Sequence, residues 1–215
     1  VKFKLKNKGN EFLVIWTTTA WTISFNLAVM VNPNLNYAKV QVGDEAWIIA
    51  EQLVSDVMSV VGKKYHVLNV VKGSALEGLE YIHPFYEKLK SIYDEIKSKS
   101  AKMHTVVLSE EYVDVSEGSG LVHCAPGCGP EDYEVGHKNG LPAFNNISTR
   151  GEFPDEMGEF SGLIARKDDP KFIHALDETR VLIARKKIEH EYPHDWRFHE
   201  PVIFRTTKQW FFRVE

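Results

Sequence analysis

Three consecutive threonines follow an apolar run and precede a tryptophan in residues 16–22, which read WTTTAWT. Successive side chains of an extended chain point to opposite faces, so at least one hydroxyl of Thr17, Thr18 and Thr19 is expected to point inward. A buried hydroxyl needs a hydrogen-bond partner, and a ribose hydroxyl or an ester oxygen of a ligand would be a suitable one. The ordinary β-propensity of threonine also accounts for the segment, so a site here needs a second motif.

A second motif, in residues 118–133, combines glycines with a histidine and a carboxylate and reads GSGLVHCAPGCGPEDY. Gly118 and Gly120 supply the backbone freedom that a tight turn or a close approach to a ligand requires. His123 follows two apolar residues, which favours a position in a pocket or in the core. Asp132 falls in the first turn of an expected helix, where the macrodipole alone favours a carboxylate. Helix capping and ligand binding are both open interpretations of Asp132.

Residues 190–194 spell HEYPH, which matches the zinc-protease pattern H-E-x-x-H. That chemistry requires both histidines on one face of a helix, one turn apart. Pro193 would remove a helix hydrogen bond and clash with the preceding turn, and it disfavours helical geometry at Tyr192. The zinc-protease interpretation is therefore rejected.

A zinc site of another kind is the main metal alternative. The four-residue spacing of the two cysteines falls within the range of structural zinc sites, but the sequence has no second cysteine pair. A zinc-dependent hydrolase is kept as an alternative on this ground alone. The candidate ligands are His123, Cys124 and Cys128, with either His194 or His199 as the fourth.

The composition is that of a soluble globular protein, with 43% hydrophobic and 26% charged residues. Its 26 basic and 30 acidic residues give a net charge of −4, which argues against a broad, sequence-independent nucleic-acid binder. Contact with a few nucleotides is still open. No apolar run reaches the roughly 18 residues of a membrane helix, and there is no signal-peptide pattern. With two closely spaced cysteines and no disulfide framework, a cytoplasmic location without membrane contact is expected.

Short strands separated by turns dominate the expected secondary structure, and the threonines stand at the end of one of them. Apolar runs and alternation predict strands at residues 12–16, 27–31, 37–42, 46–50, 65–73, 105–108, 112–115, 181–191 and 202–206. Helical periodicity predicts helices at residues 51–61, 84–99, 130–139 and 170–178. Gly43 and Asp44 are expected to form a hairpin turn. The pattern favours a barrel-like, β-rich α+β domain with a few covering helices.

The two motifs, in this order, resemble those of the editing (CP1) domain of isoleucyl-tRNA synthetases. Members of that family carry TTTPWT followed by a block like GTGxVHxAPGxGxxD, whereas the related valyl and leucyl enzymes carry TTRP in the first motif. This chain departs mildly from the isoleucyl pattern, at Ala20, Ser24 and Ser119. Residues 192–197 and 204–211 resemble the segment in which the family's chain returns toward its Rossmann catalytic core.

The resemblance implies a single editing (CP1) domain over residues 1–215, with residues 192–215 leading back toward a catalytic core that this chain lacks. It also implies the barrel-like fold of the class I Ile, Val and Leu editing domains. The HxGH and KMSKS signatures of the synthetase ATP site are missing from the sequence. The chain is therefore expected to be an excised domain that forms no aminoacyl-adenylate itself.

The activity that the resemblance implies is hydrolysis of valine misattached to isoleucine tRNA, as a second sieve. One methylene is worth only about 1–3 kcal/mol in a hydrophobic pocket, and isoleucyl-tRNA synthetase is itself the standard case. The implied partners are the aminoacylated 3′ end of isoleucine tRNA, valine and the remainder of the synthetase. No metal or cofactor is implied, because an aminoacyl ester is already activated. The alternative is a non-catalytic module that binds the tRNA 3′ end and depends on its parent enzyme.

The site roles that the resemblance implies fall on matching positions of this chain. Asp132 would hold the α-ammonium of the misattached amino acid through charge-assisted hydrogen bonds. Trp21, Asn26 and His123 would line the pocket, with His123 as the steric wall that admits valine and rejects isoleucine. The residues that would hold the terminal adenosine and the amino acid, and position the attacking water, are Thr17, Thr18 and Thr19.

Overall fold

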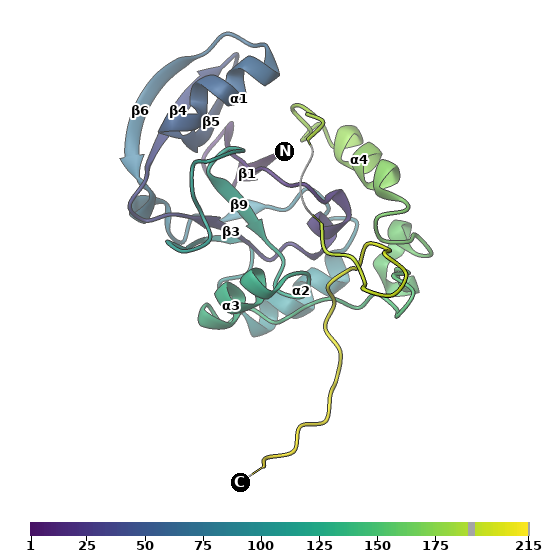
Figure 1. Cartoon of the computed structure of the whole chain (residues 1–215). Coiled ribbons are helices and arrows are strands. Elements are labelled where there is room, and N and C mark those ends of the chain that lie inside the picture. Colours follow the sequence, from purple (N-terminus) through teal and green to yellow (C-terminus); the bar gives the residue numbers. More distant parts are fainter. Residues whose placement is uncertain (189–191, 215) are drawn as a thin grey trace.

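The computed structural model describes residues 1–188 and 192–214, and its strands form two sheets (Figure 1). The larger sheet has the strand order β6-β4-β5-β2-β1-β7, in which β2 and β5 run parallel and all other neighbours antiparallel. The smaller sheet has the order β8-β3-β9, parallel between β3 and β8 and antiparallel between β3 and β9. The strands are β1 (Lys2–Leu5), β2 (Glu11–Val14), β3 (Ala28–Val31), β4 (Asn36–Val42), β5 (Glu45–Ala50), β6 (His66–Lys72), β7 (Tyr81–Ile82), β8 (Thr105–Leu108) and β9 (Leu121–Cys124).

Two isolated bridges join the edges of the smaller sheet to the larger one. Trp16, just beyond β2, pairs in parallel with Val122 of β9, and Glu80, just before β7, pairs antiparallel with Thr105 of β8. The strands β1, β2, β9, β3, β8 and β7 therefore follow one another around a ring whose two seams are single bridges instead of ladders. This arrangement confirms the expected β-rich, barrel-like α+β fold.

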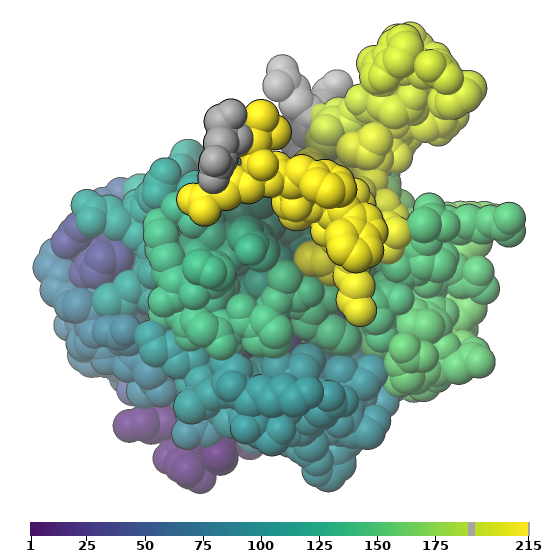
Figure 2. All heavy atoms as spheres, turned by 90° about the horizontal axis from the view of Figure 1, so that it is seen from below, coloured from purple at the N-terminus to yellow at the C-terminus, as the bar shows by residue number. Residues whose placement is uncertain are grey.

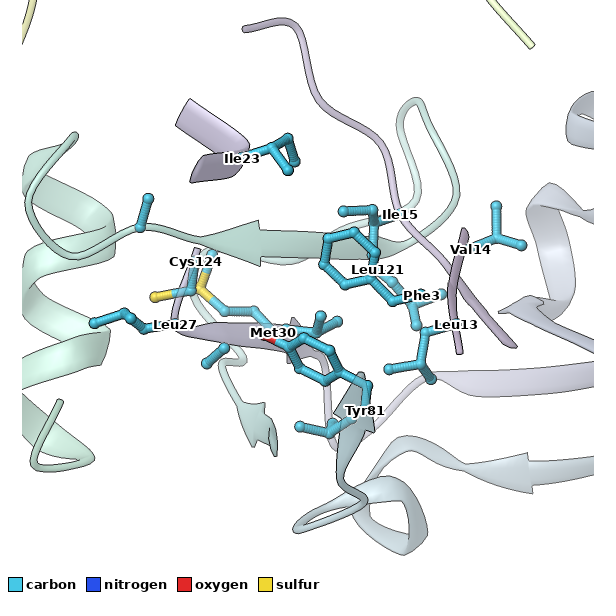
Figure 3. Packing of buried hydrophobic residues seen from close by; sticks show 14 of the residues in the cluster. Phe3, Leu13, Val14, Ile15, Ile23, Leu27, Met30, Tyr81, Leu121 and Cys124 are labelled. Carbon is cyan, nitrogen blue, oxygen red and sulfur yellow. The ribbon is translucent and has the colours of Figure 1, made fainter. Parts of the chain in front are cut away.

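Apolar side chains from strands far apart in the sequence pack together in one cluster (Figure 3). Phe3, Leu13, Met30, Tyr81 and Leu121 are each at most 3% exposed. The ring of Tyr81 stacks on that of Phe3, with 5.2 Å between the centroids. Because burial of one such side chain stabilises a protein by about 1.5–3 kcal/mol, this packing holds the strands of both sheets together.

The described residues form four α-helices around the sheets, and none of these helices combines the length and apolar character needed to cross a bilayer. Figure 1 shows α1 beside β4 and β5, α2 and α3 at the other end of the molecule, and α4 along one side. The backbone N–H of Trp21, in the short 3-10 helix η1 (Ala20–Phe25), donates to Asp169 Oδ1 at 3.2 Å and so ties α4 to η1. The α-helices are α1 (Val54–Val61), α2 (Lys90–Lys99), α3 (Pro130–Lys138) and α4 (Asp169–Glu178).

The helix expected at residues 84–99 is shorter in the structure. It begins at Lys90, and residues 84–89 form turns. Leu89 interrupts the helical geometry with a φ of −120°. The buried ring of Phe85 packs 4.9 Å from that of Phe160, measured between centroids. Tertiary packing of this segment therefore outweighs its helical periodicity.

The strand expected at residues 112–115 is wrong. Asp114 accepts hydrogen bonds from the backbone N–H of Ser116 at 2.9 Å and from its hydroxyl at 2.7 Å. Such a side-chain turn competes with strand pairing for the same backbone groups, and bends replace the strand here.

The strand expected at residues 181–191 is also wrong for its described part, because residues 181–188 contain no strand. The carbonyl of Val181 accepts one hydrogen bond from the backbone N–H of Lys2 at 2.8 Å. Further pairing is blocked because β1 already has β2 and β7 as neighbours. Residues 189–191 lie outside the described residues. The strand expected at residues 202–206 is wrong as well, because these residues contain no strand. The other expected strands and helices are confirmed to within a few residues.

A substitution at Gly120, the residue before β9, tests how closely the two sheets must approach each other. Gly120 has a φ of +71°, and a Cβ atom built there would lie 2.2 Å from Cβ of Ala50. We expect Gly120→Ala to lower the free energy of unfolding by about 2–4 kcal/mol, because overpacking adds to left-handed strain. Gly43→Ala is the control, since Gly43 has a φ of +62° but open space around its Cβ position, and should lose only about 1–2 kcal/mol. Equal losses in urea unfolding would contradict a tight approach at Gly120.

Candidate functional site

Two cavities meet at Asp132. The first, cavity A, has a volume of about 320 Å³ and is lined by Thr17, Thr18, His123 and Asp132, among others. The second, cavity B, has a volume of about 220 Å³ and contains Thr19, Trp21 and Asp132 in its lining. The structure therefore brings the threonine motif and the histidine–aspartate motif together, as the sequence predicts. The remaining residues that line cavity A are Trp16, Tyr112, Asp114, Ser116, Glu117, Ser119, Gly120, Leu121 and Val122.

Asp132 is placed by the strand-to-helix connection between β9 and α3. It is the third residue of α3, and Pro130 occupies the first position, where a missing N–H costs nothing. Its carboxylate folds back along the helix start, since a Cβ atom added at Gly129 would lie 3.1 Å from Asp132 Oδ2. The thiol of Cys124, at the end of β9, lies 3.5 Å from the backbone oxygen of Asp132 and donates to it. Strand and helix thus hold Asp132 from both sides.

The carboxylate of Asp132 has no cationic partner among the described residues. Burial, together with the nearby charge of Glu131, raises the pKa of this carboxyl from 3.8 to about 7. The hydrogen bond from the backbone N–H of Ala125 acts in the opposite direction and lowers the pKa. A half-buried carboxylate in this setting gains most from a ligand that brings a positive charge.

The three threonines form a compact turn instead of an extended strand. The hydroxyl of Thr17 lies 3.2 Å from both the backbone nitrogen and the carbonyl oxygen of Thr19, accepting from the first and donating to the second. Thr18 is exposed, and its hydroxyl lies 3.4 Å from that of Thr19. The turn directs Thr17 and Thr18 to cavity A and Thr19 to cavity B.

His123 is nearly buried on β9, with 9% of its surface exposed. Burial lowers the pKa of its imidazole to about 4, so the ring is neutral at pH 7. Its Nε2 lies 3.2 Å from Oγ1 of Thr22, whereas Nδ1 has no hydrogen-bond partner among the described residues. Sequence reasoning missed Thr22 as a site residue, although its position one helical turn after Thr19 was a usable signal.

Of the two expected pocket residues Trp21 and Asn26, Trp21 lines a cavity and Asn26 lies in the core. Trp21 is almost fully buried and lines cavity B. Asn26 is fully buried, its Nδ2 donates to the carbonyl of Ala28 at 2.7 Å, and its Oδ1 accepts from the hydroxyl of Tyr81. Asn26 therefore uses its amide inside the core and lies outside both cavities.

Two further groups border the site. Tyr112 donates its hydroxyl to Glu134 of α3 at 2.6 Å, which ties the loop along cavity A to the helix that carries Asp132. Tyr192, Pro193 and Phe204 line cavity B. Figure 2 shows the C-terminal segment, in yellow, across a hollow in this face of the molecule. Neither group carries a signal in the sequence that identifies it as part of a site.

The described residues contain no group of three histidine, cysteine or carboxylate side chains placed to hold a metal ion. Both cysteines are free thiols, and burial raises the pKa of each. His190 and Glu191 of the HEYPH pattern lie outside the described residues.

Comparison with known proteins places the sequence among synthetases. No family model matches the chain. Over its full length it is 43% identical to the isoleucine–tRNA ligase of Pyrococcus abyssi, 42% to that of Methanocaldococcus jannaschii and 40% to that of Kosmotoga olearia. The chain spans about a fifth of the length of these curated relatives, between 20% and 22%.

Among solved structures, the chain is similar to GlLeuRS-CP1, a leucyl-tRNA synthetase CP1 domain, with a TM-score of 0.63. The match covers 88% of this chain and 98% of that one at 14% identity, so it speaks for the fold alone. The sequence relatives and the shared fold together show that the chain belongs to the isoleucyl-tRNA synthetase family, as its editing (CP1) domain.

Proposed function

We propose that the chain hydrolyses the ester that joins valine to the 3′ end of isoleucine tRNA. The observation that supports this most directly is the half-buried carboxylate of Asp132, which lacks a cationic partner among the described residues at the junction of two cavities. An aminoacyl ester brings an α-ammonium, and a charge-assisted bond to it would compensate the desolvation of the carboxylate.

The α-ammonium is common to all aminoacyl esters, so Asp132 anchors the substrate without selecting it. Selection falls to the walls around the side chain, and we assign it to His123, whose neutral ring borders cavity A. A steric wall suits the task, since valine and isoleucine differ by one methylene.

In the proposed reaction a water oxygen attacks the ester carbonyl carbon. The bond from that carbon to the ribose oxygen then breaks, the ribose oxygen takes a proton, and valine leaves as the free acid. Thr17 and Thr18 line cavity A together with Asp132, and Thr19 lines cavity B together with Asp132. In the proposed reaction their hydroxyls position the water and the terminal adenosine. Positioning of this kind is a large part of what an activated ester requires.

The proposal extends to the organisation and partners of the domain. Residues 1–215 form one editing domain, and residues 192–215 lead back toward the catalytic core of a full-length synthetase. The partners are the aminoacylated 3′ end of isoleucine tRNA, valine and the remainder of that enzyme, in the cytoplasm. The contribution of Tyr192 and Phe204 to cavity B supports a continuous domain up to that point.

The first test mixes the purified chain with valine-charged and isoleucine-charged isoleucine tRNA in the presence of EDTA and follows ester loss. We expect selective loss of valine, and we expect Asp132→Ala to lower kcat/KM by about 30-fold or more, the usual cost of removing one partner of a buried charge pair. Asp177→Ala, which removes an exposed carboxylate of α4, is the control and should retain the activity.

The alternatives give different results in the same assay. A non-catalytic module would bind the tRNA 3′ end without ester loss, even before Asp132 is replaced. A zinc-dependent hydrolase would lose its activity in EDTA and regain it with added zinc.

His123→Ala tests the steric wall. We expect hydrolysis of isoleucine-charged tRNA to rise by about tenfold or more relative to valine-charged tRNA. The smaller alanine side chain leaves room in the pocket for the extra methylene of isoleucine. The measurement is the ratio of kcat/KM for the two substrates. An unchanged ratio, with hydrolysis of the valine ester intact, would assign selectivity to another wall.

The pKa of Asp132 also predicts how stability depends on pH. Its ordinary value of 3.8 rises to about 7 on folding, so the native state binds the extra proton and loses stability as the pH rises from about 4 to about 7. We expect Asp132→Asn to raise the free energy of unfolding at pH 8 by about 1–2 kcal/mol, after discounting for partial exposure. The gain should shrink as the pH falls and vanish below the ordinary pKa of 3.8, where the Asp132 carboxyl is protonated in the folded and in the unfolded chain. Urea unfolding across this range, with Asp177→Asn as control, checks the prediction; a pH-independent difference would contradict it.

A further inference from the structure

We propose that Thr22 is a positioning residue that fixes both the orientation and the proton location of the His123 ring, and thereby sets the selectivity of the site. This inference rests on the proposed function for its effect on selectivity. Its structural part stands on hydrogen bonds that can be tested separately.

The hydroxyl of Thr22 has two neighbours and only one proton. Its Oγ1 lies 2.8 Å from the carbonyl oxygen of Thr19 and 3.2 Å from Nε2 of His123. A carbonyl oxygen only accepts, so the hydroxyl proton points to Thr19. The Thr22 oxygen therefore accepts from the imidazole, and the ring carries its proton on Nε2.

The protonation state of the other ring nitrogen, Nδ1, follows from this assignment. Burial keeps the His123 imidazole neutral at pH 7, so a ring protonated at Nε2 has a bare lone pair at Nδ1. Nδ1 is buried and has no partner among the described residues. The opposite tautomer would bury an unpaired N–H, which is the less tolerable arrangement because orphaned donors are rarer than under-satisfied acceptors.

The same bond holds the ring in place. Thr22 lies on η1, one turn after Thr19, and its side chain bridges from the threonine turn to β9. A rotation of the His123 ring would break the contact and leave Nε2–H without a partner. The wall of cavity A is thus fixed by a residue that itself lines cavity B.

The chain offers a closely matched control for removal of this hydroxyl. Thr22 is 7% exposed and Thr105 is 6% exposed. Both hydroxyls donate to the carbonyl three residues earlier, Thr22 to Thr19 at 2.8 Å and Thr105 to Lys102 at 2.7 Å. Of the two hydroxyls, that of Thr22 also lies within hydrogen-bond distance of a histidine nitrogen, 3.2 Å from Nε2 of His123, and the Thr105→Val variant removes no such contact among the described residues.

The first experiment measures kcat/KM for valine-charged and isoleucine-charged isoleucine tRNA. We expect Thr22→Val to reduce the preference for valine by about tenfold, approaching the effect of a lost wall, with Thr105→Val unchanged. Thr22→Ser keeps the hydroxyl and should restore the preference. Equal preferences in Thr22→Val and Thr105→Val, or no rescue by serine, would overturn the role of Thr22 in selectivity.

The second experiment reads the proton directly and needs no activity. Nitrogen-15 NMR of the imidazole in the wild-type chain distinguishes a protonated from a bare ring nitrogen, and we expect the proton of His123 on Nε2. A proton on Nδ1 would overturn the inference even if the chain hydrolyses its substrate. If the chain hydrolyses neither ester while the proton sits on Nε2, the proposed function fails and the structural assignment holds.

Discussion

The parallel bridge between Trp16 and Val122 is the contact on which the site depends. Trp16 directly precedes the three threonines and Val122 directly precedes His123, so their pairing lays the threonine turn alongside His123. A Cβ atom at Gly118 would lie 2.8 Å from the side chain of Trp16, so a glycine at this position lets that side chain pack against the loop before β9. Gly118 and Gly120 therefore permit close packing against Trp16 and Ala50, and this packing places the second motif beside the threonine turn.

The carboxylate of Asp132 lowers the stability of the folded chain at neutral pH. A carboxylate kept half-buried without a cation among the described residues opposes folding at neutral pH, whereas exposed acids elsewhere gain from lysines, as Glu134 does from Lys138 at 2.6 Å. A sequence selected only for stability would place an amide or an apolar residue at this point of α3. Functional sites commonly keep such unfavourable groups, because the ligand supplies the missing partner.

Much of the fold and part of the site could be predicted from the sequence, for reasons that differ by residue. The hairpin at Gly43 and the helix end at Gly62 depend on local backbone preferences, which sequence carries directly. The pairing of the two motifs rested on a family resemblance. The prediction of a strand at residues 181–191 was wrong for its described part, because hydrophobic periodicity does not reveal that β1 already has two neighbouring strands. Asn26 lies in the core, and the Thr22–His123 contact depends on how η1 is placed against β9, which no local pattern encodes.

Burial away from water shifts the pKa values of the two proposed recognition residues, His123 and Asp132, in opposite directions. Burial lowers the pKa of His123 to about 4 and raises that of Asp132 to about 7. Near neutral pH the histidine is therefore uncharged, and it does not repel an ammonium bound nearby, as an imidazolium would. An incoming ammonium stabilises the ionised carboxylate and leaves the histidine neutral. Under the proposed function, charge would anchor the substrate at Asp132 while the shape of the wall at His123 would select the side chain. A site divided in this way would hold any aminoacyl ester by its ammonium and select among side chains by size.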